Sequence, residues 1–292
     1  MRYSPPRVPE PDVDARLAAA ASPERVPLLR AALRVLGETA AYRIRKHEAN
    51  NLAGTVSLLV ARGATLPDLA LRTAFAALLN LLVYLLNDLG DVELDLGTPG
   101  KDRRKTEFLR QHRRAALVAL VSIFIVLLAV ALLHAPVLVA ALVASSALVG
   151  VYTFWLKRLP LVDVALMGVC GFTMTLCGVR EGDLWRSLTL AGFLGLVSAS
   201  FQVLQVVRDV AADRAAGLRT TAAVLGLRGA GLLFRGLTLV LAAYAFFVVH
   251  SYAAVGVLLA LALPVDPTRA TRTWDLARLL FGAAWIAMLL GV

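Results

Sequence analysis

Nine stretches of the chain consist mainly of apolar residues and are separated by short clusters of charged residues. They cover residues 49–63, 67–87, 115–134, 135–155, 161–180, 187–207, 229–249, 251–265 and 274–292. A helix needs about 20 apolar residues to cross the hydrocarbon core of a bilayer. The first and eighth stretches are shorter, so they must tilt or break if they cross it. The pattern predicts an all-α, multi-pass integral membrane protein with about nine transmembrane helices.

The composition supports this interpretation and argues against a soluble protein. Of the 292 residues, 59% are apolar, and the mean hydropathy is +0.74, whereas a soluble domain would be nearer half apolar. The net charge of +10 could indicate nucleic-acid binding, but the basic residues lie at the ends of the apolar stretches, where membrane topology explains them. We therefore expect membrane lipid and no nucleic acid as a partner. The sequence leaves the oligomeric state open.

The N-terminal part of the chain differs from the rest. Residues 1–27 are polar and rich in Pro, without the apolar core of a signal peptide. We expect a flexible tail over residues 1–27 and a single transmembrane domain over residues 28–292. Residues 24–48 show an amphipathic pattern, with Leu28, Leu29 and Leu33 among its apolar positions. This pattern predicts a helix in the lipid headgroup layer.

The basic residues are distributed unevenly between the two sides of the membrane. If the N-terminus is cytoplasmic, the loops on that side hold most of them, including the run at residues 101–105. The loops on the other side hold only Arg62, Arg72, Arg180 and Arg186. Because cytoplasmic loops carry an excess of Lys and Arg, we expect the N-terminus to be cytoplasmic.

The segment with the clearest chemistry is at residues 87–95, which read NDLGDVELD at the end of the second apolar stretch. On a helix, Asp88, Asp91 and Asp95 share one face. Three neighbouring carboxylates repel one another unless a cation lies between them. Mg²⁺ prefers such oxygen ligands and completes its coordination with water and substrate phosphate. The segment therefore predicts a metal-diphosphate site, and the competing interpretation is an acidic helix end beside a basic loop.

A second acidic pair follows the sixth apolar stretch. Asp209 and Asp213 are one helical turn apart and share a face, and Arg208 precedes them. The predicted topology places this pair on the same side of the membrane as the first motif. Ionisable residues at membrane depth are functional candidates, although the pair alone could be a solvated helix end. Together the two motifs predict two Mg²⁺ ions that bridge one diphosphate on the cytoplasmic side.

Two further groups of polar residues are candidates for the same site. Residues 152–158 read YTFWLKR at the end of the fourth stretch, and Tyr152 and Lys157 could hold diphosphate oxygens. The alternative is an interfacial aromatic belt with positive-inside anchoring. In the first stretch, Asn51 either faces a cavity or forms a hydrogen bond between helices.

In this order, the three segments resemble the UbiA superfamily of intramembrane prenyltransferases. The family pattern is NDxxDxxxD, a YSxxLKR-like stretch and DxxxD. The matching residues are Asn87, Asp88, Asp91, Asp95, Tyr152, Leu156, Lys157, Arg158, Asp209 and Asp213. The resemblance covers residues 43–292. Val206 stands where many relatives carry an additional Asp, and the Arg-Pro-Ile-x-Ser-Gly ending common after the first motif is missing.

The resemblance implies nine transmembrane helices around a central cavity. It also implies Mg²⁺-dependent transfer of a prenyl group from a prenyl diphosphate to a lipid-soluble acceptor, usually aromatic. One Mg²⁺ would be bound by Asp88, Asp91 and Asp95, and the other by Asp209 and Asp213. Asn87 would contact phosphate or orient a carboxylate. The expected diphosphate contacts are Lys157, Tyr152 and Arg208, with Lys101 and Arg103 from the loop.

Other activities fit parts of the pattern. Pro99 and Lys101 stand where a phosphoribosyl-transferring branch has related residues, so phosphoribosyl transfer to a polyprenyl phosphate is one alternative. Cyclisation of a prenyl diphosphate without an acceptor is another. A non-enzymatic lipid-binding protein or transporter is the alternative from a different class, but acidic residues in transporters usually lie near mid-membrane.

Overall fold

The computed structural model describes residues 26–46, 50–98 and 101–291, and these residues form helices and connecting turns without any strand. The predicted tail at residues 1–27 lies almost entirely outside the described residues. The helices are α2 (Leu28–Arg45), α3 (Asn50–Ala61), α4 (Leu66–Gly90), α5 (Val92–Gly97), α6 (Arg103–Gln111), α7 (Arg113–His134), α8 (Pro136–Phe154), α9 (Val162–Thr175), α10 (Leu184–Ala215), α11 (Thr221–Phe247), α12 (Ala254–Leu258) and α13 (Ala270–Leu290). Short 3-10 turns at Leu156–Arg158, Leu176–Gly178, Glu181–Asp183 and Leu259–Ala262 complete the order.

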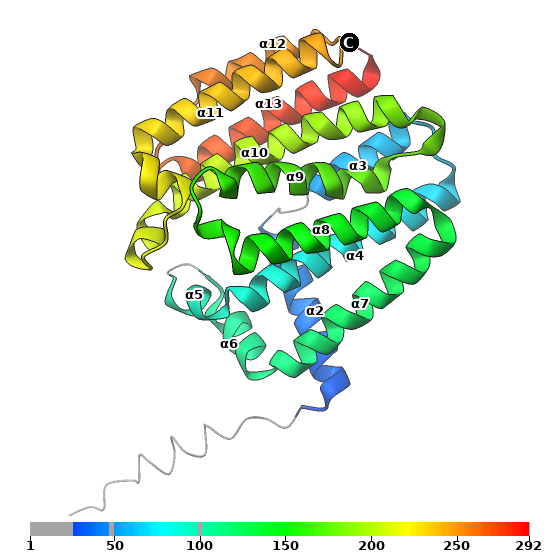
Figure 1. Ribbon diagram of the computed structural model, residues 1–292, viewed down its shortest axis with the longest axis vertical. Coiled ribbons are helices and arrows are strands. Elements are labelled where there is room, and N and C mark those ends of the chain that lie inside the picture. The colour runs from blue at the N-terminus through cyan, green and yellow to red at the C-terminus, as the bar shows by residue number, and fades with distance from the viewer. Residues whose placement is uncertain (1–25, 47–49, 99–100, 292) are drawn as a thin grey trace, which may run out of the picture.

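Six helices of the described chain are long and apolar enough to cross a membrane: α4, α7, α8, α10, α11 and α13. The prediction of a multi-pass all-α protein is confirmed. The remaining apolar stretches form shorter helices, namely α3, α9 with the turn after it, and α12 with the turn after it. The number of nine transmembrane helices therefore stays a prediction. Figure 1 shows the long helices packed side by side, with α5 and α6 at one end of the bundle.

Helix α10 lies at the centre of the bundle. It has 32 residues. In its apolar 18-residue segment 72% of the residues are buried, compared with 28% in that of α7 at the periphery. α10 packs most extensively against α9. Glycines permit this close approach, because a Cβ at Gly195 would lie 2.9 Å from the carbonyl oxygen of Gly168 on α9. Small residues have this role in membrane helix packing, where backbones approach each other directly.

The buried side chains form separate clusters on the two sides of α9 and α10. One cluster joins α10 to α11 and α13 through Phe193, Phe234 and Phe281. Another joins α4, α7, α8 and α9, with Leu79 and Leu127 at its interior. A third cluster lies beneath α2, α5 and α6. This third cluster sits under the first acidic motif and fixes its helix end against α2.

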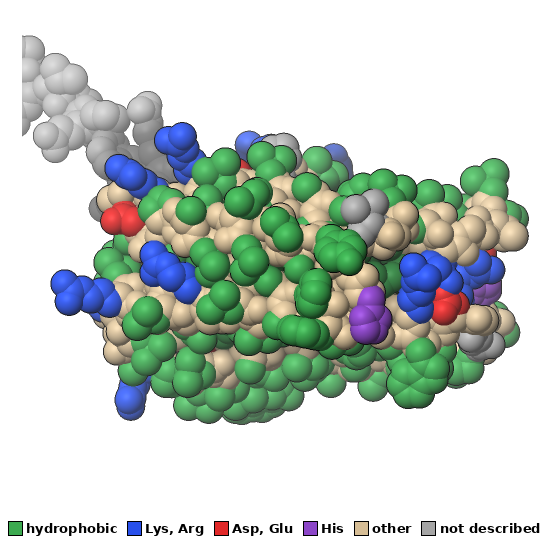
Figure 2. All heavy atoms as spheres, turned by 90° about the horizontal axis from the view of Figure 1, so that it is seen from above, with side chains coloured by type: hydrophobic (Ala, Val, Ile, Leu, Met, Phe, Trp, Pro, Cys, Tyr) green, Lys and Arg blue, Asp and Glu red, His purple; other side chains and the backbone are tan. Residues whose placement is uncertain are grey.

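The surface between the two ends of the bundle is largely hydrophobic. Figure 2 shows one face on which apolar side chains cover the middle, while Lys, Arg and His side chains gather toward the ends. Helix α7 also exposes leucines and valines, among them Leu117, Val121 and Leu132. Exposed apolar residues on this scale are expected where lipid rather than water is the solvent.

Helix α2 corrects one detail of the predicted amphipathic helix. Leu28, Leu29 and Leu33 are exposed, whereas Ala31 and Ala32 are buried in the cluster that α2 shares with α4, α6 and α7. The small residues face the protein and the leucines face outward, which is the arrangement that a surrounding lipid phase favours.

Candidate active site

The three predicted motifs lie at one end of the bundle, where α4, α8 and α10 end. Helix α4 ends at Gly90 and α5 begins at Val92, so Asp91 is the junction between them. The helical hydrogen bonds nevertheless continue, since the amide N–H of Asp91 donates to the carbonyl of Asn87 at 3.0 Å and that of Asp95 donates to Asp91 at 2.8 Å. The three aspartates therefore keep nearly helical spacing across the junction.

Asp88 is the most deeply placed of the three. Only 4% of its side chain is exposed, and Lys105 of α6 donates to Asp88 Oδ2 at 2.7 Å. Arg43 of α2 donates to the other oxygen, Oδ1. Both cations also lie over aromatic rings, Lys105 over Tyr42 and Arg43 over Tyr84. Asp88 thus holds α2, α4 and α6 together, and both of its oxygens already have cationic partners.

Asp91 is held by side chains from two helices. Lys157, in the turn after α8, forms an ion pair with it. Asn87 donates from Nδ2 to Asp91 Oδ2 at 3.2 Å, and Thr153 of α8 donates to Asn87 Oδ1 at 3.0 Å. Burial raises the pKa of Asp91, although the Lys157 ammonium acts in the opposite direction. Asn87 thus orients a carboxylate, which is one of its two predicted roles.

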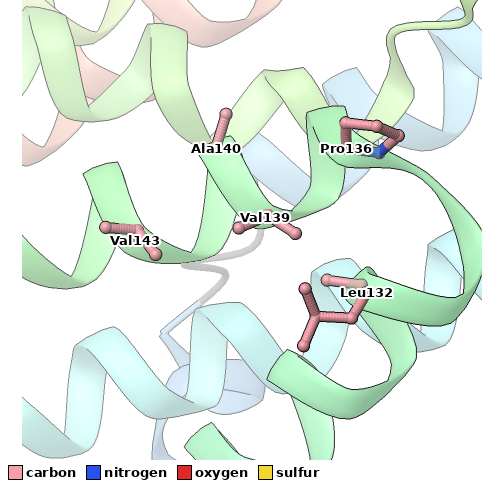
Figure 3. A pocket seen from close by; sticks show the side chains of 6 residues that line it. Leu132, Pro136, Val139, Ala140 and Val143 are labelled. Carbon is pink, nitrogen blue, oxygen red and sulfur yellow. The ribbon is translucent and has the colours of Figure 1, made fainter.

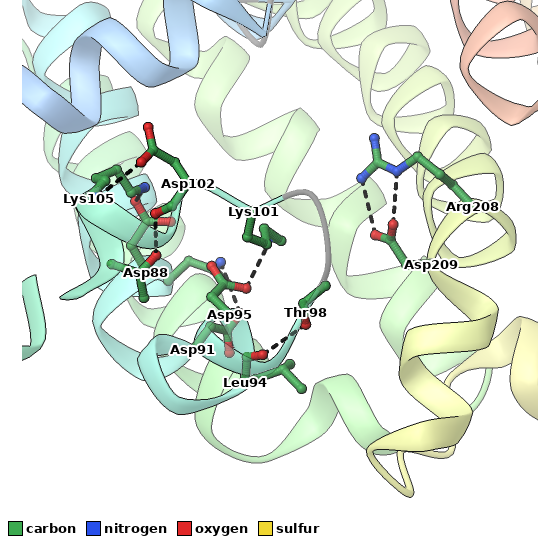
Figure 4. Close-up of polar contacts among 12 residues, drawn as sticks. Asp88, Asp91, Leu94, Asp95, Thr98, Lys101, Asp102, Lys105, Arg208 and Asp209 are labelled. Carbon is green, nitrogen blue, oxygen red and sulfur yellow. Dashed lines mark hydrogen bonds and ion pairs between the residues drawn. The ribbon is translucent and has the colours of Figure 1, made fainter. Parts of the chain in front are cut away.

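Asp95 of α5 pairs with the loop residue Lys101, whose Nζ lies 3.1 Å from Asp95 Oδ1. Lys101 also interacts electrostatically with Asp209 of the second acidic motif. Burial lowers the pKa of Lys101, but the adjacent Asp95, together with smaller effects of Tyr42 and Asp209, outweighs burial, and the net shift of the pKa is upward. In Figure 4, Lys101 lies between Asp95 on one side and the Arg208–Asp209 pair on the other.

The second motif lies near the end of α10. Arg208 pairs with Asp209 through two contacts, of 2.9 and 3.1 Å. Asp213 accepts a hydrogen bond of 2.8 Å from the hydroxyl of Thr220 and interacts electrostatically with Lys157. Lys157 therefore pairs with Asp91 and interacts electrostatically with Asp213, as Lys101 does with Asp95 and Asp209. Two lysines thus link the two acidic motifs.

This donor set fits a metal-phosphate complex better than a closed protein cage. Among the described residues, no three Asp, Glu, His or Cys side chains converge closely enough to hold an ion by themselves. Mg²⁺ usually takes one or two carboxylates and completes its shell with water and substrate phosphate. Two acidic motifs at one end of the bundle, linked by two lysines, suit that mode. The assignment of individual aspartates to Mg²⁺ stays a prediction.

The remaining predicted site residues lie at different distances from this centre. Tyr152 accepts a hydrogen bond of 3.2 Å from the buried Gln202 of α10, so it joins α8 to α10 beside the acidic residues. Arg103 is exposed at the start of α6 and interacts electrostatically with Glu107 of the same helix. Asn51 donates to Met174 Sδ of α9 at 3.3 Å, which is a contact between helices, and its position at a cavity stays a prediction.

Several residues of the site were not predicted from the sequence. Arg43 lies in the predicted amphipathic helix at residues 24–48 and Lys105 in the basic run at residues 101–105, and neither was predicted as a partner of Asp88. Gln202 could have been found, because it is a polar residue seven positions before Asp209 on an apolar helix and therefore shares its face. Thr220, which holds Asp213, gave no signal in the sequence beyond its place in a turn.

A buried hydrogen-bond network connects the two halves of the site. The fully buried Asp163 of α9 accepts from the backbone N–H of Thr221 at 2.9 Å and from the Thr221 hydroxyl. That hydroxyl accepts the N–H of Leu161 at 2.7 Å. Leu161 has a φ of 67°, a left-handed conformation that is costly for a leucine. The network ties the chain after Lys157 to the start of α11, next to Thr220.

An apolar groove of the described chain lies away from this site. It has a volume of about 520 Å³ and is lined by apolar residues of α7 and α8, including Leu132, Pro136 and Val143. Figure 3 shows these side chains near the end of α7 and the start of α8, so the groove is at the other end of α8 from Lys157. It contains no chemistry-bearing side chain and belongs to the lipid-facing surface.

The fold and the site define a multi-pass helical membrane protein with a polar, acidic centre at one end of its bundle. The family model for the UbiA prenyltransferase family matches residues 52–289. The chain therefore belongs to that family, and the resemblance noted from its motifs is confirmed.

Individual relatives have limited similarity. A digeranylgeranylglyceryl phosphate synthase from Methanoculleus marisnigri is 29% identical over 185 residues, which is 62% of this chain and 65% of that protein. A lycopene elongase/hydratase from Halobacterium salinarum is 28% identical over 195 residues, which is 60% of this chain and 66% of that protein. The chain thus matches just under two thirds of the length of these relatives.

Solved structures agree on the fold. A UbiA homologue from Archaeoglobus fulgidus bound to GPP and Mg²⁺ has a TM-score of 0.61 and 17% identity, covering 89% of this chain and 99% of that one. A UbiA homologue from Aeropyrum pernix K1 in its apo form has a TM-score of 0.60 and 19% identity, covering 82% and 96%.

Proposed function

We propose that this protein transfers a prenyl group from a prenyl diphosphate to a lipid-soluble acceptor, aromatic or from another lipid pathway, in a Mg²⁺-dependent reaction within the membrane. The observation that carries the proposal is the pair of acidic motifs at one end of the bundle, linked by Lys101 and Lys157, each of which pairs with the first motif and interacts electrostatically with the second. The family match and the GPP and Mg²⁺ bound to a structural neighbour support it.

The proposed ligands for two Mg²⁺ ions come from both motifs. Asp91 and Asp95 would hold one ion, with Asp88 behind them, and Asp209 and Asp213 would hold the other. Bound Mg²⁺ neutralises the charge that builds on a leaving diphosphate. Asn87 and Thr153 fix the orientation of the Asp91 carboxylate, and Thr220 fixes that of Asp213.

The lysines would contact the diphosphate itself. Each ammonium group pairs with a carboxylate of the first motif and interacts electrostatically with one of the second, which suits contact with a diphosphate that both motifs hold through Mg²⁺. In the reaction, the bond between the allylic carbon and the diphosphate oxygen breaks, and its electron pair leaves with the diphosphate. The acceptor nucleophile forms the new bond to that carbon and releases its proton.

A direct assay tests this function. Purified protein in lipid is incubated with Mg²⁺, a labelled prenyl diphosphate and a phenol, an alkylglycerol phosphate or a polyene as acceptor. We expect a labelled adduct with one class of acceptor. Asp95→Asn and Asp209→Asn should each lower the rate by about 100-fold or more, as loss of charge-stabilising groups does. Glu93→Gln is the matched control, because Glu93 is exposed on the same short helix as Asp95.

Other outcomes of that assay would overturn the proposal. A phosphorylated sugar-lipid as the product would indicate phosphoribosyl transfer. A cyclic hydrocarbon that forms without any acceptor would indicate cyclisation. Binding of lipid without turnover of any prenyl diphosphate would favour the non-enzymatic alternative.

We also propose that the site end of the bundle is cytoplasmic, because that end carries most of the basic loop residues. Arg219→Cys near Asp213 and Arg186→Cys at the opposite end of α10 provide the test, since both positions are exposed. Cys170 and Cys177 are buried and give little background. An impermeant maleimide added to intact cells should label only the cysteine at position 186. Labelling at position 219 would show that the site end of the bundle faces the outside of the cell.

A further inference from the structure

A polar pocket, separate from the apolar groove of α7 and α8, lies beside the acidic motifs. It has a volume of about 420 Å³ and is lined by Tyr42, Arg45, Lys46, Lys101 and Asp102. Three of these five residues are cationic. The walls come from the end of α2 and from the loop that precedes α6. Lys101 is shared, since it lines this pocket and also pairs with Asp95.

The surroundings of the pocket carry more positive than negative charge. Arg45 lies 3.5 Å from Asp102, Lys101 pairs with Asp95, and Lys105 and Arg43 both pair with Asp88. Lys46 has its ammonium 5.9 Å from the centre of the Tyr42 ring. Among the residues that line the pocket itself, three cations accompany one carboxylate, which leaves an excess of about two positive charges. A phosphate monoester carries about −1.5 to −2 charges at pH 7.

We infer that this pocket binds a phosphate group on the head of the acceptor lipid. The inference rests on the proposed prenyl transfer and names the class of its acceptor. In the proposed reaction the donor diphosphate is bound through Mg²⁺ at the two acidic motifs and by Lys101 and Lys157, so Arg45 and Lys46 are left to bind a second anion. Through Lys101 that anion lies next to the site of the leaving diphosphate. A phenol or a polyene hydrocarbon carries no phosphate that Arg45 and Lys46 could bind.

The pocket is also placed for a ligand that comes from the membrane. α2 exposes Leu28, Leu29 and Leu33, which fits contact with lipid, and its last turn brings Arg45 to the pocket. An amphiphile with its chain in the bilayer and its phosphate at the surface would approach along this route. Cations at such an interface bind lipid phosphates readily, so the test must separate the acceptor from bulk phospholipid.

The experiment compares an alkylglycerol 1-phosphate with the same alkylglycerol without its phosphate. We expect the wild-type protein to use the phosphate form with a KM at least about tenfold lower. Arg45→Gln and Lys46→Gln should each raise that KM by about tenfold, the size expected for losing one charged hydrogen bond. The KM for the prenyl diphosphate should stay unchanged in both variants. Arg30→Gln is the matched control, since Arg30 is exposed on the same helix far from the pocket.

Two arms of the experiment separate the possible sources of phosphate. The assay is repeated in nanodiscs of neutral lipid and in nanodiscs that contain phosphatidylglycerol. If Arg45→Gln and Lys46→Gln change only the dependence on phosphatidylglycerol, the pocket binds bulk phospholipid and the inference is wrong. Equal use of the two alkylglycerols by the wild type would also overturn it.

Direct binding separates this inference from the proposed function. The affinity of the alkylglycerol 1-phosphate is measured without a prenyl diphosphate, for wild type and for the Arg45→Gln/Lys46→Gln double variant. Binding lost in the double variant supports the pocket even if no prenyl transfer is ever detected. Unchanged binding refutes the pocket even if prenyl transfer to another acceptor is found.

Discussion

Because Asp88 is buried, we expect its substitution to lower the free energy of unfolding more than substitution of the more exposed Asp209 does. In Asp88→Asn the shape is kept and the negative charge is lost. Arg43 and Lys105 then remain with 17% and 9% of their side chains exposed and without their shared counter-charge. Removing one partner of a buried ion pair costs about 3–5 kcal/mol. Contacts of both cations with tyrosine rings, worth about 0.5–2 kcal/mol, offset part of this cost.

We therefore expect Asp88→Asn to lower the free energy of unfolding by about 3 kcal/mol, toward the lower end of the range for a broken buried pair. Asp209→Asn removes a pair whose side chains are 42% and 37% exposed, and exposed pairs contribute only about 0–1 kcal/mol. Unfolding of the two variants by SDS titration in mixed micelles gives the comparison. A double-mutant cycle with Lys105→Met should show a coupling above about 1 kcal/mol. Equal stability of Asp88→Asn and Asp209→Asn would refute this reasoning.

Three other predictions follow from the site. Chelation of divalent ions with EDTA should abolish prenyl transfer and added Mg²⁺ should restore it; transfer that persists in EDTA contradicts a metal-dependent site. Lys157→Met should raise the KM for the prenyl diphosphate by about tenfold through loss of a charged contact, while the acceptor KM stays constant; steady-state kinetics distinguishes these, and an unchanged donor KM removes Lys157 from the diphosphate site. Thr221→Val should lower the free energy of unfolding by about 1–3 kcal/mol, because the Leu161 N–H and the Asp163 carboxylate lose a buried partner, and Thr221→Ser should restore it. A thermal melt that fails to separate the Val and Ser variants would show that the hydroxyl network is unimportant.

Local patterns predicted much of the fold. Long apolar stretches separated by charged residues require helices, since a backbone in lipid must satisfy its hydrogen bonds internally. The spacing of Asp88, Asp91 and Asp95 gave their common face, and it held even though α4 ends between them. The equal direction of α4 and α10 placed both acidic motifs at one end. These properties depend on helix geometry and topology, which the sequence carries locally.

The residues that face the interior could not be predicted in the same way. In a soluble protein the leucines of α2 would mark its buried side, but lipid is as apolar as leucine, so hydrophobicity does not distinguish core from lipid-facing surface. Packing density decides instead, and the small residues Ala31 and Ala32 are the ones that contact the bundle. Asn51 illustrates the same limit, because a cavity contact and a helix contact have the same pattern in the sequence.

The partners of the aspartates were beyond prediction for a different reason, which also explains how the site can work. The ion pairs join residues far apart in the chain, such as Asp88 with Arg43 and Asp91 with Lys157, and only the packing of α2, α4 and α8 decides which cation meets which acid. The sequence motif does not distinguish its three aspartates. In the structure both oxygens of Asp88 pair with cations, whereas Asp91 and Asp95 each pair with one lysine from another element. Those lysines also interact with the second motif. In the proposed reaction, Asp91 and Asp95 would bind Mg²⁺ and the two lysines would contact the diphosphate, whose negative charge would offset most of the positive charge that Mg²⁺ adds.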